Sequence, residues 1–463
     1  MTSATRYAVT AYGVFSVFVY GFLAIVKGTF FQKRTERQLV ELQIASDRLW
    51  NLSKDFAGLS HHILTLASGF KFHLVSNEVP GSTEAQNSTK PLVIFIHGFP
   101  DSWAVWRNVI NQPELQKSAT IVALDMPGYG GSEGLPKYDG TNVLEKMTEL
   151  IITLRSKYGV DDETTKNKKK TIILAHDWGC VVAMRLAAEA PTVADRFVLS
   201  NGPLPALALS NIKRLLSTAQ KKFQEARAAP LRAYSPLREA WQALRPVLRQ
   251  GVLSGYIFAM QLPVPWVKYF LTGGNASLMR DVHTGSYGKA KFTMRDIAES
   301  MASTLGPSLS ESKTETPNGE TYPTSINFNG EFANIMGPAS YYREGAAQSR
   351  WHKSPEIEAW LSEHGATGLD EGLPGSFKAP ATVFWGEKDI ALEKAICLDG
   401  IIDFTSANSQ VVLLPESGHF TPVELESRAA FLRTVQWFID GEQGDVGTAI
   451  QEVYPSARVL AQK

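Results

Sequence analysis

Short apolar runs alternate with longer helical stretches along most of this 463-residue chain. The runs have the length and the β-branched and aromatic content of buried strands. They occupy residues 70–75, 92–96, 120–124, 171–175, 197–200, 381–385 and 410–414, and helical patterns lie among them at 142–158, 178–190 and 423–439. This alternation predicts an α/β fold with a mainly parallel, doubly wound sheet, whose functional loops follow the carboxyl ends of the strands.

The strand pattern is interrupted once, by a long insertion. It stops after residue 202 and resumes near residue 379. We therefore expect residues 69–202 and 379–463 to form two parts of one core, and residues 203–378 to form a large helical lid over it. Within the lid, residues 203–250 carry nine Lys or Arg against two Glu, with apolar residues between them. That segment fits either a solvated face or a basic amphipathic surface on anionic lipid.

The amino-terminal segment predicts a membrane anchor. Residues 8–26 carry no charge and are bounded by Arg6 and Lys27. As a helix this stretch spans roughly 28 Å, close to the hydrocarbon thickness of a bilayer. A cleaved signal peptide has a shorter apolar region and a small-x-small cleavage site, which is not evident here. We expect residues 1–27 to form a single-pass anchor and residues 28–68 a helical connector.

The distribution of charged residues predicts the orientation of that anchor in the membrane and limits the possible binding partners. Basic residues are more frequent after the apolar stretch than before it, which favours a cytosolic location for the rest of the chain. We expect the membrane to be that of the endoplasmic reticulum. Over the whole chain, 46 basic residues balance 46 acidic ones, so no global charge favours nucleic acid as a partner. The two cysteines fit neither a disulfide framework nor a metal site. We expect no metal and no organic cofactor.

The strongest chemical signal follows the strand at 171–175. The sequence continues His-Asp-Trp-Gly-Cys and passes at once into a helical pattern, with Asp177 at the turn. A nucleophile on such a strand-turn-helix elbow needs small neighbours, because the strand and helix backbones nearly touch. Ala175 and Gly179 meet that need. Asp177 is therefore a candidate nucleophile, although aspartate is also a common helix N-cap.

A second loop supplies the amide groups that such a nucleophile requires. His-Gly-Phe-Pro at 97–100 follows the strongly apolar strand at 92–96. We expect the backbone N–H groups of Phe99 and Trp178 to form an oxyanion hole at the Asp177 carboxylate. His97 and His176, which flank these loops, are interpreted as structural neighbours.

Two later strands end in a candidate acid and a candidate base. Asp389 lies just after the strand at 381–385, and His419 lies behind Gly418, just after the strand at 410–414. The chain order nucleophile, acid, histidine is the one that this type of fold uses. Glu387 is the alternative acid.

Together these segments resemble the epoxide hydrolases of the α/β-hydrolase family over about residues 70–440. The resemblance rests on His-Gly-Phe-Pro-Asp-Ser-Trp at 97–103, His-Asp-Trp-Gly at 176–179, Glu-Lys-Asp at 387–389 and Ser-Gly-His at 417–419. It implies the α/β-hydrolase fold, an aspartate nucleophile and two lid tyrosines that activate the epoxide oxygen.

The sequence offers a candidate for each lid tyrosine. Tyr256 is followed five residues later by Gln261 and seven later by Pro263, which is similar to the first family segment. Tyr342, in an aromatic-Tyr-Arg triplet, resembles the second, with Tyr341 as its competitor.

The resemblance implies the hydrolysis of epoxides to vicinal diols. Asp177 would open the ring, Tyr256 and Tyr342 would donate hydrogen bonds to the leaving oxygen, and His419, oriented by Asp389, would activate water. The anchor suggests a small lipophilic epoxide that arrives at a membrane. Two alternatives remain, a haloalkane or fluoroacetate dehalogenase and a non-catalytic binding protein on the same scaffold. The oligomeric state is not set by the sequence.

Overall fold

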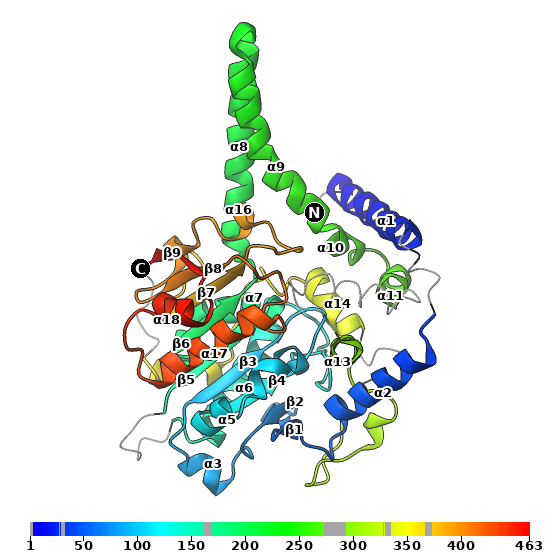
Figure 1. The fold of residues 1–463 in the computed structure, drawn as a ribbon, viewed down its shortest axis with the longest axis vertical. Coiled ribbons are helices and arrows are strands. Elements are labelled where there is room, and N and C mark those ends of the chain that lie inside the picture. The colour runs from blue at the N-terminus through cyan, green and yellow to red at the C-terminus, as the bar shows by residue number, and fades with distance from the viewer. Residues whose placement is uncertain are drawn as a thin grey trace.

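One twisted sheet runs through the core of the molecule (Figure 1). The computed structural model describes residues 3–26, 28, 33–161, 169–272, 293–326, 328, 335–365 and 373–463. In this part of the chain the sheet has nine strands in the order β1-β2-β4-β3-β5-β6-β7-β8-β9. The strands are β1 (Ser60–Thr65), β2 (Lys71–Ser76), β3 (Leu92–Ile96), β4 (Thr120–Leu124), β5 (Thr171–His176), β6 (Arg196–Ser200), β7 (Ala381–Gly386), β8 (Gln410–Leu414) and β9 (Arg458–Gln462).

The seven strands predicted from the sequence are all present, as β2 to β8. The six from β4 through β8 in sheet order are parallel, whereas β1, β2 and β9 pair antiparallel at the two edges. Every residue of β3 is buried, which explains why such strands read as continuous apolar runs.

Helices cover both faces of the sheet, as a doubly wound fold requires. Successive residues of β3 point to opposite faces: Ile94 belongs to the cluster that contains α6 and α7, and Phe95 to the cluster that contains α17 and α18. The helices of the core are α3 (Thr83–Asn87), α4 (Arg107–Ile110), α5 (Pro113–Ser118), α6 (Gly140–Lys157), α7 (Trp178–Glu189), α16 (Lys394–Cys397), α17 (Leu425–Ile439) and α18 (Val446–Val453).

The prediction of a helical connector over residues 28–68 is wrong in its second half. Helix α2 spans only Glu36–Trp50, starting with a capping box between Thr35 and Gln38. Strand β1 follows, with four successive buried residues. A strand buried on both faces lacks the alternation of polar and apolar residues by which it could be recognised. Residues 29–32 lie outside the described residues.

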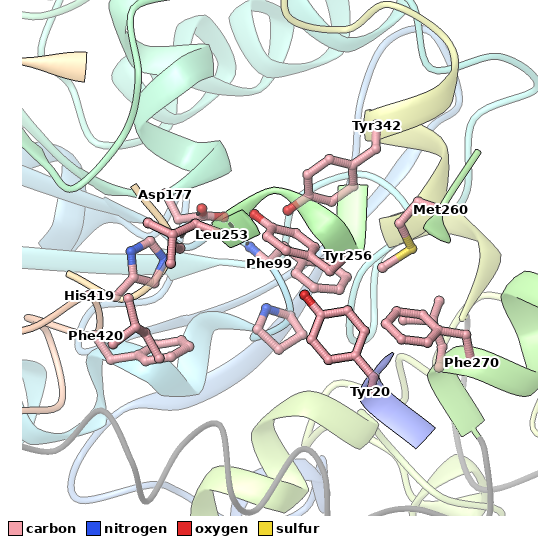
Figure 2. A pocket seen from close by; sticks show the side chains of 14 residues that line it. Tyr20, Phe99, Asp177, Leu253, Tyr256, Met260, Phe270, Tyr342, His419 and Phe420 are labelled. Carbon is pink, nitrogen blue, oxygen red and sulfur yellow. Dashed lines mark hydrogen bonds and ion pairs between the residues drawn. The ribbon is translucent and has the colours of Figure 1, made fainter. Parts of the chain in front are cut away.

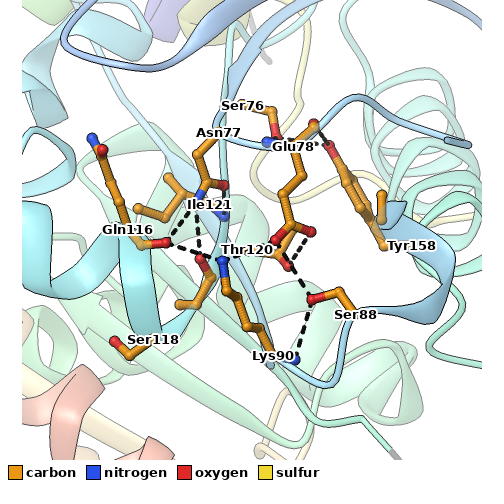
Figure 3. Close-up of polar contacts among 12 residues, drawn as sticks. Ser76, Asn77, Glu78, Ser88, Lys90, Gln116, Ser118, Thr120, Ile121 and Tyr158 are labelled. Carbon is orange, nitrogen blue, oxygen red and sulfur yellow. Dashed lines mark hydrogen bonds and ion pairs between the residues drawn. The ribbon is translucent and has the colours of Figure 1, made fainter. Parts of the chain in front are cut away.

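Side-chain hydrogen bonds fasten the end of β2 to the start of β4 (Figure 3). The side-chain oxygen of Asn77 accepts a hydrogen bond from the backbone N–H of Ile121 at 2.7 Å, and its amide nitrogen donates to the carbonyl of Ala119 at 2.9 Å. Thr120 donates to Glu78 at 2.9 Å. These bonds replace ladder pairing where β2 leaves the sheet, so they hold the antiparallel edge to the parallel core.

The insertion between β6 and β7, residues 203–378, is mainly helical where described, with turns and loops at 306–326 and 344–354, and we call it the lid. Its helices are α8 (Pro205–Ala228), α9 (Tyr234–Leu253), α10 (Gly255–Ala259), α11 (Val264–Thr272), α13 (Met294–Leu305), α14 (Met336–Arg343) and α15 (Pro355–Glu363). Helices α8 and α9 form a long antiparallel hairpin that projects from the body (Figure 1). Its tip exposes Leu231 and Tyr234 fully or nearly so.

The amino-terminal helix α1 (Ser3–Val26) is long and apolar enough to cross a membrane. Over Thr5–Val26 its mean hydropathy is 2.0, and 17% of its apolar window is buried in the molecule. The buried part is one face of the helix, which packs against the lid beside α10 and α11 (Figure 1). This helix is thus attached to the body rather than separate from it.

Candidate active site

Asp177 occupies a strained turn between β5 and α7. Its backbone torsions are φ 51° and ψ −117°, a conformation that non-glycine residues rarely adopt. A Cβ added at Gly179 would lie 2.3 Å from the carbonyl oxygen of His97, and one added at Gly98 would lie 2.5 Å from Asp177 Oδ1. Both glycines are therefore required by close approach, and the turn presents the carboxylate at the end of the strand.

The amide of Phe99 donates a 2.7 Å hydrogen bond to Asp177 Oδ1. This is the first of the two oxyanion-hole contacts predicted from the sequence. The second expected donor, the amide of Trp178, heads α7 beside the carboxylate, but among the described contacts it makes no hydrogen bond to it. The amides at the start of a helix lack partners within that helix, so the Trp178 N–H remains available to an oxygen at this position.

His419 lies between two carboxylates. Its Nε2 is 3.5 Å from Asp177 Oδ2, and its Nδ1 is 2.9 Å from Asp389 Oδ2. Both aspartates and the histidine are buried. Asp389 Oδ1 also accepts hydrogen bonds from the backbone amides of Ala391 and Leu392, at 2.6 and 2.8 Å. The acid, the base and the candidate nucleophile thus form one connected chain.

Asn201 was not predicted from the sequence, and it fixes the acid. It follows β6 in a left-handed conformation, with φ 48°. Its amide nitrogen donates to Asp389 Oδ2 at 2.6 Å, and its side-chain oxygen accepts from the Gly386 amide at 3.1 Å. An Asn-Gly pair directly after a strand was the only local signal, and Asn tolerates this conformation better than most residues.

Charges around His419 set its protonation. Burial lowers the pKa of His419, but the negative charges of Asp389 and Asp177 outweigh burial and raise that pKa to about 10. Burial raises the pKa of Asp389, and its contacts with His419 and Asn201 overcome this and lower it. At neutral pH His419 is therefore an imidazolium, paired with the carboxylate of Asp389.

The alternative acid, Glu387, points away from this chain. It forms ion pairs with Lys394, at 3.0 Å, and with Arg458. Glu387 therefore does not contact His419.

Tyr256 and Tyr342 enter the site from the lid and face Asp177 (Figure 2). Their rings are nearly perpendicular, with centroids 5.7 Å apart, and both contact the ring of Phe99. Burial and the charge of Asp177 raise the pKa of Tyr256 above its ordinary value. Burial and the neighbouring tyrosine raise the pKa of Tyr342 as well. Both hydroxyls therefore stay protonated and act as hydrogen-bond donors.

The residues that accompany these tyrosines in sequence join their two segments. The Gln261 side chain donates to the carbonyl of Tyr342 at 2.7 Å, and the Arg343 guanidinium donates to the carbonyls of Met260 and Leu262. Tyr341, the competitor of Tyr342, is buried and donates its hydroxyl hydrogen to the carbonyl of Pro127 at 3.0 Å. Tyr341 therefore has a packing role, and Tyr342 is the one that lines the site.

A cavity of about 250 Å³ joins these groups. Asp177, His419, Tyr256 and Tyr342 supply polar groups to it, and Tyr20 from α1 lines it on the side of Phe270 (Figure 2). The other lining residues are apolar: Phe99, Pro100, Leu253, Met260, Phe270, Leu271, Ile390, Ala391 and Phe420. In the described part of the chain no three His, Cys, Asp or Glu side chains are arranged to hold a metal ion.

The two neighbouring histidines have structural contacts. His97 Nε2 accepts a hydrogen bond from the amide of Met126 at 2.9 Å. His176 Nε2 donates to the carbonyl of His419 at 2.7 Å, and burial together with the charge of His419 lowers the pKa of His176 to about 4. A neutral His176 thus supports the backbone of the base.

Sequence comparison agrees with this geometry. A family model described as the alpha/beta hydrolase fold matches residues 91–246, which include the loop at Phe99 and the turn at Asp177. The protein has the α/β-hydrolase fold and is a hydrolase. The insertion between β6 and β7 of this hydrolase begins within the matched region and extends well beyond it.

Curated relatives of this hydrolase include epoxide hydrolases. Epoxide hydrolase 3 of Mus musculus is 24% identical over 363 residues, which cover 77% of this chain and 71% of the relative. Epoxide hydrolase 1 of Caenorhabditis elegans is 30% identical over 136 residues, which cover 29% of this chain and 30% of the relative. The chain thus spans most of the first relative and about a third of the second.

Epoxide hydrolases are also among the similar solved structures. An epoxide hydrolase from Vigna radiata aligns with a TM-score of 0.49 at 18% identity, covering 84% of this chain and 100% of that one. An epoxide hydrolase from Bacillus megaterium, in complex with an inhibitor, aligns with a TM-score of 0.48 at 19% identity, covering 82% and 100%.

Proposed function

We propose that this hydrolase converts epoxides to vicinal diols through a covalent ester on Asp177. The observation that carries the proposal is the pair of protonated tyrosine hydroxyls, on Tyr256 and Tyr342, that face a carboxylate across an apolar cavity. An epoxide needs a nucleophile at carbon and a proton donor at oxygen, because the departing alkoxide is too basic to leave unaided. The relatives named epoxide hydrolase agree with this reaction.

In the first step Asp177 attacks one ring carbon and the bond from that carbon to the ring oxygen breaks. The oxygen takes a proton from one tyrosine while the other tyrosine stabilises the resulting phenolate. Phe99 holds the second carboxylate oxygen through its amide at 2.7 Å, which orients the attacking oxygen toward the cavity. The product of this step is a hydroxyalkyl ester of Asp177.

In the second step water attacks the carbonyl carbon of that ester. His419 accepts the proton from water, and the amides of Phe99 and Trp178 stabilise the oxyanion. The tetrahedral intermediate collapses, and the leaving diol oxygen takes the proton that His419 accepted from water. The proton of the regenerated Asp177 carboxyl then returns to His419. One water and one epoxide thus give one diol, and the enzyme regains its initial state.

The charges around His419 link the two steps. While Asp177 is ionised, its charge helps to raise the pKa of His419 and keep the imidazolium. Forming the ester removes that charge, so the pKa of His419 falls. The imidazolium then gives its proton to the tyrosine phenolate, and the neutral imidazole can accept a proton from water. The base is thereby activated only after the nucleophile has reacted.

Dehalogenation is the nearest competing reaction, and the lining of the cavity argues against it. A halide leaves as an anion and is held by N–H donors from side chains. Among the described residues that line the cavity, no tryptophan or asparagine side chain is present, and Phe99 offers no side-chain donor. Two hydroxyl donors suit an oxygen that must be protonated.

We also propose that the enzyme acts at a membrane. Helix α1 supplies the anchor, and the positive charge that follows it favours a cytosolic catalytic body. The membrane of this proposal is that of the endoplasmic reticulum. The apolar wall of the cavity suits a small lipophilic substrate that partitions into such a membrane.

Repeated turnover in ¹⁸O-labelled water tests the function. The mechanism requires label in the Asp177 carboxylate after several turnovers, because water attacks the ester carbonyl and leaves one oxygen on the enzyme. Direct attack of water on the epoxide would place label in the diol alone. Full activity of an Asp177→Ala variant would also overturn the proposal.

A further inference from the structure

A side chain of the amino-terminal apolar helix reaches the catalytic cavity. Tyr20, on α1, lies beside Phe270 and close to Tyr256 (Figure 2). Its hydroxyl lies close to the backbone at Gly255 and Tyr256, and its ring centroid is 5.8 Å from that of Phe270. A helix that served only as a tether would have no reason to contribute to this cavity.

The rest of α1 is fitted to the lid by specific contacts. Tyr12 donates a hydrogen bond to the carbonyl of Gly251 at 2.7 Å, and its ring meets that of Phe258 edge-on, with centroids 4.8 Å apart. A Cβ added at Gly13 would lie 2.5 Å from the carbonyl oxygen of Phe258. The two helix backbones are in close contact at that glycine, as at the small-residue interfaces of packed membrane helices.

A second close contact lies one turn further, next to Tyr256. A Cβ added at Gly255 would lie 3.0 Å from the Tyr20 hydroxyl and 3.1 Å from Ser16 Oγ. Helix α1 therefore packs closely against Gly255, the residue that immediately precedes Tyr256. The docking of α1 thus bears on the position of the proton donor as well as on the shape of the cavity.

The opposite face of α1 is free of the lid. Phe15, Phe18 and Phe22 are 59%, 67% and 64% exposed. Gly21 has nothing within 4 Å of the position that a Cβ would take. One face of α1 thus packs against the lid, while the opposite face is apolar, exposed and able to contact lipid.

We propose that α1 is a wall of the substrate cavity and that Tyr20 is a specificity-determining residue for the apolar part of the substrate. The reacting oxirane is fixed between Asp177 and the lid tyrosines, so a long apolar substituent extends toward Tyr20 and Phe270. The enzyme then prefers epoxides with a long alkyl or aryl chain over short ones. The preference for long-chain epoxides rests on the proposed function, whereas the assignment of α1 as a wall of the cavity does not.

The first experiment compares two aromatic residues of the same helix in the full-length protein in phospholipid nanodiscs. Values of kcat/KM are measured for 1,2-epoxydodecane and 1,2-epoxybutane. Tyr20→Ala should lower the ratio of long to short substrate about tenfold, mainly through KM, because one aromatic contact is lost. Phe22→Ala, on the exposed face, should leave the ratio within about twofold. An unchanged ratio in Tyr20→Ala, or equal changes in both variants, would overturn the assignment of Tyr20.

The second experiment needs no substrate and tests the wall. Gly13→Val should increase amide hydrogen exchange at residues 251–262, because its side chain displaces α1 from α10, whereas Gly21→Val should exchange like the wild type. Equal exchange in Gly13→Val and wild type would refute the docking. If the wild type hydrolyses neither epoxide, the proposed function fails, and exchange alone then decides whether α1 is a wall.

Discussion

Replacing Asp389 with Asn should both slow ester hydrolysis and move its pH dependence. Two unit charges 4 Å apart interact by about 4 kcal/mol at an effective dielectric constant of about 20. That energy equals about three pKa units. In the ester state Asp177 is no longer charged, so the charge of Asp389, 2.9 Å from the histidine, is the main influence that opposes burial. Its removal should lower the pKa of His419 by about that amount.

The direction of the shift in pH dependence follows from the role of His419 as the base. His419 must be neutral to accept a proton, so hydrolysis of the ester is lost as pH falls through the pKa of His419. A lower pKa moves this acid limb to lower pH. The Asn amide would also donate to Nδ1 and leave the proton on Nε2, where the base has to accept one, so the maximal rate should fall about 10³- to 10⁴-fold.

Rapid-quench single turnover at a series of pH values measures both effects, with decay of the alkyl-enzyme followed by intact mass. Glu387→Gln is the matched control, since that carboxylate pairs with Lys394 on the surface. It should leave the pH profile and the rate unchanged. An acid limb in Asp389→Asn that stays within half a pH unit of wild type, or a rate within twofold, would refute the assignment of the acid.

Three further outcomes are expected. Tyr256→Phe and Tyr342→Phe should each slow ester formation about 10²-fold and the double variant more, because donors to the leaving oxygen are lost; a double variant as fast as the wild type in a burst assay would contradict this. Asn201→Ala should lower kcat about tenfold with little change in KM, because Asp389 loses its 2.6 Å donor and keeps two amides; steady-state kinetics at pH 7 decide. Gly179→Val should lower the Tm by several degrees, since its Cβ would lie 2.3 Å from a carbonyl oxygen, and an unchanged melting curve would count against the close approach.

The features that the sequence predicts well are those with local causes. The turn at Asp177 needs Gly179 within two residues, and the buried parallel strands are continuous apolar runs, so both were readable without tertiary information. Edge strands were not readable. Strand β9 is exposed along most of its length and its apolar run is only three residues long. Strand β1 lacks alternation because it is buried on both faces.

Long-range contacts account for the site residues that the sequence could not resolve. Tyr341 and Tyr342 are neighbours of the same type, and only the bond from Tyr341 to the carbonyl of Pro127 separates their roles. Asn201 meets Asp389 across 188 positions of sequence. Tyr20 reaches the cavity only because α1 docks on the lid, and its apolar sequence alone predicted no more than a membrane anchor.

Trapping of the ester tests the central claim most directly. His419→Gln should still form the ester but hydrolyse it slowly, so incubation with an epoxide should raise the intact mass by the mass of that epoxide. Peptide mapping should place the added mass on Asp177, and the Asp177→Ala variant should show none. No added mass in His419→Gln, or the same mass on another residue, would contradict the account.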